Sequence, residues 1–302
     1  MTKRTNEGGG AVRRVSDELR VRLSDGAYPL NSFLPSQEKL AQEFGVSRDT
    51  VQRALHVLRT EGWIESRQGQ GSRVVRRQHI QSSTPRATRS RHPMTLGPLI
   101  AEAFERDEVA LDIATLTSES LDAHVRVQAE RIRARIIAPR RITLRMILPA
   151  EKLAMPYPRN KDDQEDPRLP RRLHAITRVH TGSLRTVLDQ LRTENLVPSV
   201  DLQIRHTELT PTFKLYVINH DEVLHGFYEP ILRTVILEDG TEVEAVDVLG
   251  LGATLTHHVR DTDPDSAGSA FVNNATRWFE SVWKLLACQP QDPRDPEGAP
   301  LR

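Results

Sequence analysis

The chain has 302 residues, of which 37% are apolar, and this is enough for two domains with separate cores. Its formal net charge is only +1, but residues 1–92 hold 17 Lys or Arg against nine Asp or Glu, whereas the other residues hold 25 against 32. A basic first part and an acidic remainder predict that only the first part contacts a polyanion.

The single cysteine, Cys288, excludes an intramolecular disulfide and a zinc site built from cysteines. No apolar run reaches 18 residues and no apolar core follows the basic N-terminus, so we expect a cytoplasmic protein with no membrane partner. The histidines are scattered without metal-ligand spacing, and we expect neither a metal nor a cofactor.

Residues 1–10 are expected to form a flexible arm, and residues 11–77 to form a compact first domain with three helices. Apolar residues recur at helical spacing from Val12 to Leu23. Ser36 is the expected N-cap of a second, short helix that Gly45 ends, and Ser47 caps the third helix. The third helix is expected to leave the following side chains on its outer face: Arg48, Thr50, Gln52, Arg53 and His56.

Two helices joined by a tight turn that contains glycine are typical of a helix-turn-helix, whose second helix enters the major groove of DNA. Residues 63–67 and 72–77 predict two short strands joined by a polar turn with Gly69, Gln70 and Gly71. Helix-turn-helix folds also serve as protein–protein modules, and this reading stays open as the alternative.

These residues resemble the DNA-binding domain of the GntR family of bacterial transcription regulators. The chain matches the family pattern at Leu34, Pro35, Ser36, Leu40, Ala41, Val46, Ser47, Arg48, Thr50, Val51, Ala54, Leu55, Leu58, Glu61, Gly62, Gly69, Gly71 and Val74. It departs at Gln37, where glutamate is usual, and at Leu30-Asn31, which replaces a Pro-Gly turn. The matched pattern covers about a fifth of the chain.

The resemblance implies a sequence-specific regulator, more often a repressor than an activator, that binds a palindromic double-stranded operator as a homodimer. It also implies the DNA-contacting residues, which would be Ser36, Ser47, Arg48, Thr50 and Arg53, with Gly69, Gln70 and Gly71 at the tip of the wing.

Residues 78–93 hold several Ser and Pro, five arginines counted from Arg76 and no acidic residue, and predict an extended linker. Residues 94–288 predict an α/β effector-binding and dimerisation domain, and residues 289–302 a disordered tail. Within the second domain we expect helices at 96–104, from Ser118 or Ser120 to 136, at 183–195 and around Phe271 to Leu286. We expect strands at 109–116, 142–148, 199–206 and 213–219, a loop at 155–172 and a hairpin turn at 238–240.

Residues 211–228 also resemble a strand of phospholipase D-like enzymes, in which His-x-Lys-x4-Asp supplies a nucleophile and phosphate-binding groups. Lys214 occupies the lysine position, but Thr212 replaces the histidine and Asn219 the aspartate. Threonine cannot form the phosphohistidine intermediate, so the resemblance implies a non-catalytic domain that keeps an anion site at Lys214 and Asn219.

We therefore expect an α+β winged helix-turn-helix head followed by an α/β body, acting together as a ligand-responsive repressor with no catalytic residues. The effector is not identified by the sequence, and Lys214 favours an anion. Two alternatives stay open: a DNA-binding protein whose body is an active phosphodiesterase, and a regulator with a chorismate-lyase-like sensor domain.

Overall fold

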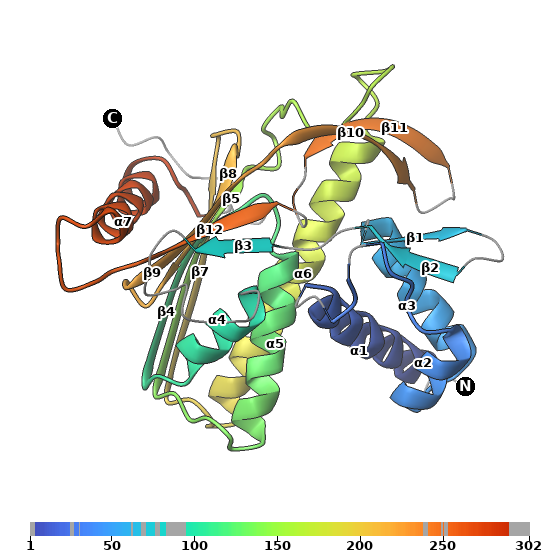
Figure 1. The fold of residues 1–302 in the computed structure, drawn as a ribbon, viewed down its shortest axis with the longest axis horizontal. Helices are drawn as coiled ribbons and strands as arrows, with labels where there is room; N and C mark the ends of the chain where they lie inside the picture. The colour runs from blue at the N-terminus through green and yellow to red at the C-terminus, as the bar shows by residue number, and fades with distance from the viewer. Residues whose placement is uncertain are drawn as a thin grey trace, which may run out of the picture.

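The structure is a computed structural model that describes residues 4–24, 27–29, 31–61, 63–67, 71–75, 79–82, 95–237, 241–248, 250 and 253–289. It consists of a small head that lies against a larger body (Figure 1). Residues 1–3 of the predicted arm and residues 290–302 of the predicted tail lie outside the described residues.

The head is a winged helix-turn-helix. Its elements are α1 (Arg4–Ser24), α2 (Gln37–Phe44), α3 (Arg48–Glu61) and the antiparallel strands β1 (Ile64–Arg67) and β2 (Gly71–Val74). Leu19, Leu58 and Trp63 are buried where the three helices and the hairpin meet. The predicted helices and hairpin are therefore confirmed, because the apolar stripe of each helix closes one shared core.

The first helix begins earlier than the sequence predicts. Because α1 starts at Arg4, residues 4–10 belong to a helix and not to a flexible arm. The glycines at 8–10 disfavour a helix and suggested an irregular segment. Once a helix has formed, however, each further residue adds one hydrogen bond at low cost. Helix α1 therefore extends toward the N-terminus beyond the apolar residues that pack into the core.

The body is built on a seven-stranded mixed sheet. Its strand order is β3-β12-β9-β8-β4-β5-β7. The strands are β3 (His79–Ser82), β4 (Glu108–Ala114), β5 (Arg141–Pro149), β7 (Ser199–Thr207), β8 (Phe213–Ile218), β9 (Glu222–Phe227) and β12 (Thr254–Val259). The pairs β4–β5 and β5–β7 are parallel, whereas β8 pairs antiparallel with β4 and with β9.

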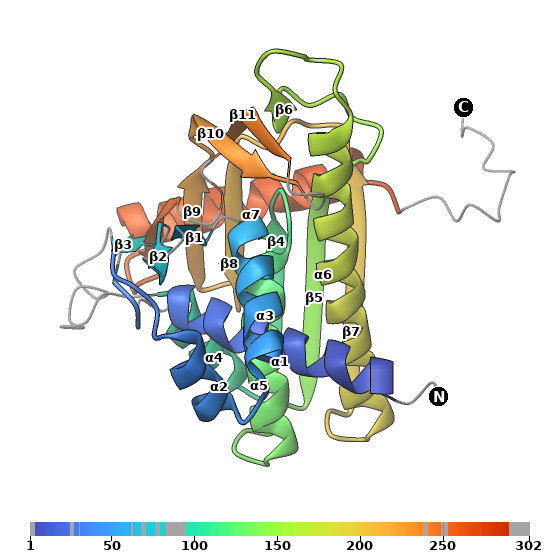
Figure 2. The same ribbon diagram turned by 90° about the vertical axis from the view of Figure 1, so that its right-hand side faces the viewer.

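Helices cover both faces of this sheet. The helices α4 (Leu96–Phe104), α5 (Glu119–Arg133) and α6 (Arg168–Thr193) share the larger core with one face, as Figures 1 and 2 show. Helix α7 (Ala267–Leu285) packs on the other face through Val272, Phe279 and Trp283. The predicted α/β body is confirmed, and four strands and three helices lie within a few residues of their expected positions.

A second, smaller sheet lies over the first turns of α6. Strands β10 (Pro230–Ile236) and β11 (Glu242–Val248) form the predicted hairpin, whose turn at 238–240 is outside the described residues. The two-residue strand β6 (Arg159–Asn160) pairs with β11. Leu169 of α6 is buried beneath this sheet together with Val235 and Val243.

Two predictions for the body are wrong. Residues 79–82, assigned to the linker, form β3 and pair in parallel with β12, with Ile80 buried in the main core. Residues 168–182, assigned to the loop and the segment after it, belong to α6, which begins 15 residues before the predicted start. Pro170 is compatible with this helix because it lies in the first turn, where a backbone N–H is not needed.

The head rests on the body through α1, which lies across α5 (Figures 1 and 2). A carboxylate oxygen of Asp17 on α1 lies 3.0 Å from Nη2 of Arg126 on α5. The recognition helix α3 also contacts β10 of the hairpin. Both contacts join elements of the head to elements that surround a cavity in the body.

Candidate functional site

The start of α3 is held by a side-chain cap. The hydroxyl of Ser47 accepts a hydrogen bond from the backbone N–H of Thr50 at 3.2 Å and lies 2.9 Å from the Thr50 hydroxyl. Ser36 caps α2 in the same way, accepting from the N–H of Lys39 at 3.3 Å. Gly45 ends α2 in the left-handed region, with φ at 62°. These caps fix the angle between the two helices of the turn.

Arg48 and Arg53 lie on the outer side of α3, and each is more than half exposed. Nη1 of Arg48 lies 3.0 Å from a carboxylate oxygen of Glu38, and Nη2 of Arg53 donates to Asp49 at 2.5 Å. Exposed pairs of this kind stabilise a protein by no more than about 1 kcal/mol. Both arginines can therefore exchange a carboxylate for a phosphate or a base edge at little cost.

Thr50 is not on the outer face, where the helical spacing placed it. Its side chain is buried and its hydroxyl is directed to Ser47, because the third position of a helix faces back toward the cap. A DNA contact by Thr50 stays a prediction, and its observed role is to hold the cap. Gln52 and His56, which the family pattern does not specify, are exposed beside the two arginines.

The wing is described only in part. Gly69 and Gln70 lie outside the described residues. Gly71 adopts φ of 86°, and a Cβ at this position would lie 3.7 Å from the ring of Phe33. The backbone conformation, and not lack of space, is what requires glycine here.

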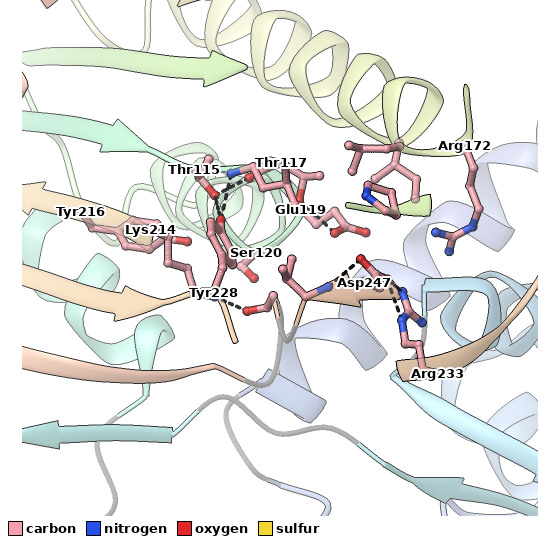
Figure 3. Close-up of a pocket in the computed structure, with 16 residues that line it drawn as sticks. Thr115, Thr117, Glu119, Ser120, Arg172, Lys214, Tyr216, Tyr228, Arg233 and Asp247 are labelled. Atoms are coloured by element: carbon pink, nitrogen blue, oxygen red, sulfur yellow. Dashed lines mark hydrogen bonds and ion pairs between the residues drawn. The ribbon is translucent and has the colours of Figure 1, made fainter. Parts of the chain in front are cut away.

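A cavity of about 70 Å³ opens in the body at the end of β4, beside the first turn of α5 (Figure 3). Lys214 of β8 is 3% exposed, lines this cavity and donates a hydrogen bond to the carbonyl of Gly250. Arg172 extends from α6 toward the same space. On the hairpin, Nε of Arg233 donates to the carboxylate of Asp247 at 2.6 Å.

Hydroxyl groups also line the cavity. The Tyr228 hydroxyl accepts from the N–H of Leu116 at 2.8 Å and lies 3.0 Å from the Thr115 hydroxyl. Burial raises the pKa of Tyr228 to about 12, so the phenol stays neutral at physiological pH. Glu119 is buried and accepts from the Thr117 hydroxyl at 3.0 Å. The cavity thus presents cations, carboxylates and neutral hydroxyls to a single space.

The structure separates the two residues predicted to hold an anion. Lys214 is near the start of β8, whereas Asn219 follows its end, about 16 Å away for five residues of strand. Asn219 adopts φ of 49° in the turn to β9, and its side-chain oxygen accepts from the N–H of Ala110 at 2.8 Å. Asn219 is therefore a turn residue, and the prediction that it shares a site with Lys214 is wrong.

Thr212 lines a neighbouring cavity of about 230 Å³ together with Phe213 and Trp278. The lining of the Lys214 cavity contains groups that the sequence did not single out, namely Glu119, Arg172, Arg233 and Asp247. They come from four separate elements, and no spacing in the sequence connects them.

Among the described residues, no group of three or more His, Cys, Asp or Glu side chains is placed to hold a metal ion. Within the same part of the chain, no helix combines the length and the apolar character needed to cross a membrane.

Comparison with known proteins places the head in a family. Residues 11–74 match the model described as "Bacterial regulatory proteins, gntR family". An uncharacterized HTH-type transcriptional regulator of Rhizobium meliloti (strain 1021) is 36% identical over 90 residues, which are 30% of this chain and 36% of the relative. The Glc operon transcriptional activator of Escherichia coli (strain K12) is 33% identical over 108 residues, 35% of this chain and 42% of that protein.

A solved structure of a putative GntR-family transcriptional regulator matches 24% of this chain and 30% of its own, at 34% identity and a TM-score of 0.21. The chain spans less than half the length of each of these two curated relatives. The predicted GntR-type head is confirmed, whereas the phospholipase D-like resemblance of the body stays a prediction.

Proposed function

We propose that this chain, whose residues 11–74 form a gntR-family winged helix-turn-helix domain, is a transcription regulator that binds double-stranded DNA in a sequence-specific manner. The observation that carries the proposal is the exposed start of α3. Arg48 and Arg53 are more than half exposed, and the caps at Ser36 and Ser47 hold α2 and α3 in the geometry that places a helix in the major groove.

Ser36, Ser47 and the wing residues Gly69 to Gly71 would contact the phosphates on either side of the groove. The basic charge of the first 92 residues supports this arrangement, because phosphate contacts supply the part of the affinity that does not depend on sequence. The protein would act in the cytoplasm, bound to the nucleoid.

The regulator would be a homodimer that reads two half-sites of a palindromic operator, with the body supplying the dimer contact. We further propose that the body senses a ligand and releases the operator, as a repressor does. A sensor fits better than a phospholipase D-like enzyme because, among the described residues that line the Lys214 cavity, there is no His to take the phosphoryl group.

The test is the effect of Arg48→Ala on two kinds of DNA. An operator is first selected from random duplexes with the full-length protein, and affinities for it and for an unrelated duplex are then measured at one salt concentration. If Arg48 reads a guanine edge, the variant loses roughly 5- to 150-fold on the operator, which corresponds to about 1–3 kcal/mol, and far less on the unrelated duplex.

Arg192→Ala is the matched control, because Arg192 is also exposed and paired with a neighbouring carboxylate, but lies on α6 of the body. It should leave both affinities unchanged. Equal losses on the two duplexes for Arg48→Ala would make this residue a phosphate contact. A selection that yields no preferred sequence would contradict sequence-specific binding, and a full-length protein that binds its operator as a monomer would contradict the dimer.

A further inference from the structure

The Lys214 cavity has the composition of a binding site for a small charged molecule. Among the described residues, five charged ones line it: the cations Arg172, Lys214 and Arg233, and the carboxylates Glu119 and Asp247. Arg233 and Asp247 neutralise each other through their side-chain hydrogen bond. The formal charge of the lining is therefore positive by one, and its polar groups face a space large enough for a small ion rather than a bulky apolar ligand.

Lys214 is the group around which this site is built. A lysine that is 97% buried on a central strand is unusual, because removing an ammonium group from water is costly unless polar or charged partners surround it. Its Nζ donates to the Gly250 carbonyl, which turns the ammonium toward the cavity wall (Figure 3). An anion in the cavity would add a charged partner to the polar one that Gly250 supplies.

The first turn of α5 contributes in a second way. The N-cap residue of this helix is Ser118, but its side chain makes no capping hydrogen bond. Its hydroxyl oxygen is buried and has no hydrogen-bond partner among the described residues. The next residues, Glu119 and Ser120, line the cavity. The N–H groups of a first helical turn have no partner within the helix, and they favour an anion at this end of the helix.

We propose that this cavity binds a small organic oxyanion that also carries a hydroxyl or amino group. The carboxylate or phosphoryl group of the ligand contacts Lys214, Arg172 and the first turn of α5. Its hydroxyl or amino group donates to Glu119, the carboxylate that Arg233 does not neutralise. The proposal that a ligand binds here does not depend on the proposed function. Only the expected effect of the ligand on DNA affinity rests on the proposed function.

The experiment measures the thermal stability of the full-length protein without DNA, at constant ionic strength, with inorganic phosphate, malonate and hydroxymalonate as probes and chloride as the reference salt. A ligand that binds the folded protein raises Tm in a saturable way, by a few degrees at 100 times its Kd. Hydroxymalonate is expected to bind more tightly than malonate because its hydroxyl can donate to Glu119.

Arg172→Gln should weaken the response to the probes at least tenfold. The matched control is Arg171→Gln, which changes the exposed neighbour on the same helix and should leave the response intact. Lys214→Met is expected to abolish the response, but this variant could also affect folding, so Arg172→Gln decides. Glu119→Gln should remove the preference for hydroxymalonate over malonate.

A response to phosphate alone identifies a phosphoryl compound as the ligand, and a response to the two dicarboxylates alone identifies an organic acid. The absence of a saturable response to all three probes, or an equal response in Arg172→Gln and wild type, would overturn the proposal. Neither result would touch the DNA-binding proposal, which is measured on the operator without any anion.

Discussion

Arg145 joins two strands of the main sheet to α7, and its loss should cost considerable stability. It lies on β5, and its Nε and Nη2 donate to the two carboxylate oxygens of Asp112 at 2.7 and 2.6 Å. The same Nη2 donates to Glu280 of α7 at 2.6 Å, and the guanidinium lies 5.2 Å from the ring centre of Phe279. Because Asp112 is almost fully buried, removing Arg145 leaves a charge inside the protein without its partner.

Breaking a buried pair in this way costs about 3–5 kcal/mol, so Arg145→Met should lower Tm by roughly 6–20 °C. The exposed Arg140, which lies 3.8 Å from Asp107, is the control, and its replacement by Met should cost at most about 1 kcal/mol. Urea unfolding followed by tryptophan fluorescence suits the measurement because Trp278 and Trp283 both lie on α7.

The double variant Arg145→Met with Asp112→Leu distinguishes the cost of an unpaired charge from the cost of lost packing contacts. Replacing both charges by apolar groups removes the unpaired carboxylate, so the double variant should recover most of the loss. A loss below about 1 kcal/mol in Arg145→Met, or a double variant less stable than the single one, would refute this reasoning.

Two further predictions concern stability. Burial lowers the pKa of His124 to about 4, below its ordinary value of 6.5, so the folded protein binds fewer protons than the unfolded chain between these values. Stability should therefore be fully present above pH 6.5 and fall by up to about 1.4 kcal/mol per pH unit toward pH 4, and urea midpoints that do not change between pH 7.5 and 5 would contradict this. A Cβ at Gly226 would lie 2.7 Å from the carbonyl of Thr254, so Gly226→Ala should cost about 1–3 kcal/mol. Gly182 lies in α6 with open space around it, and Gly182→Ala should instead stabilise by about 0.5–1 kcal/mol; Tm values in the reverse order would exclude this explanation.

The head could be predicted almost completely because its signals are local. Its helices are marked by apolar residues at helical spacing and by caps at Ser36, Gly45 and Ser47, and each signal lies within a few residues of the element that it determines. Thr50 was misplaced because helical spacing alone ignores the cap, which turns this hydroxyl inward.

The body was predicted less well wherever a contact joins distant residues. Strand β3 is recognisable only through its pairing with β12, about 175 residues further along the chain. The apolar stripe of α6 is interrupted by His180. This histidine is buried, and its Nδ1 lies 2.8 Å from a carboxylate oxygen of Asp122 on α5, which provides a polar partner inside the protein. A histidine at a core position hides the helical period, so the first half of the helix was missed.

The candidate cavity illustrates the same limit. Lys214 could be selected from the sequence, but the residues that give its surroundings their charge, among them Arg172 and Asp247, come from elements that only the fold brings together. Asn219 was paired with Lys214 because the phospholipase D-like resemblance places the two residues five positions apart in one motif. A strand, however, separates its ends by about 3.3 Å per residue, so nearness in sequence placed them at opposite ends of the sheet.

Helix α5 connects the cavity with the head, and this connection predicts how a ligand would affect DNA binding. Its first turn lines the cavity, and two turns later Arg126 lies 3.0 Å from Asp17 of α1 and donates to Ser183 of α6 at 3.2 Å. A ligand that shifts the start of α5 must also move Arg126, because the hydrogen bonds of a helix make it rigid along its axis. Asp17 keeps its bond to Arg20 at 2.6 Å, so Arg126→Ala should leave the head folded.

Arg126→Ala should therefore bind the operator with nearly the affinity of wild type, but lose most of the effect that phosphate or hydroxymalonate has on that affinity. Coupling between two sites typically amounts to a factor of about 5–150, which competition binding with a labelled operator can resolve. Arg131→Ala is the control, because Arg131 also lies on α5 but its Nη2 donates to Glu105 within the body at 2.8 Å. If the anion still changes the affinity of Arg126→Ala for DNA as it does in wild type, the signal does not pass through the contact between α5 and α1.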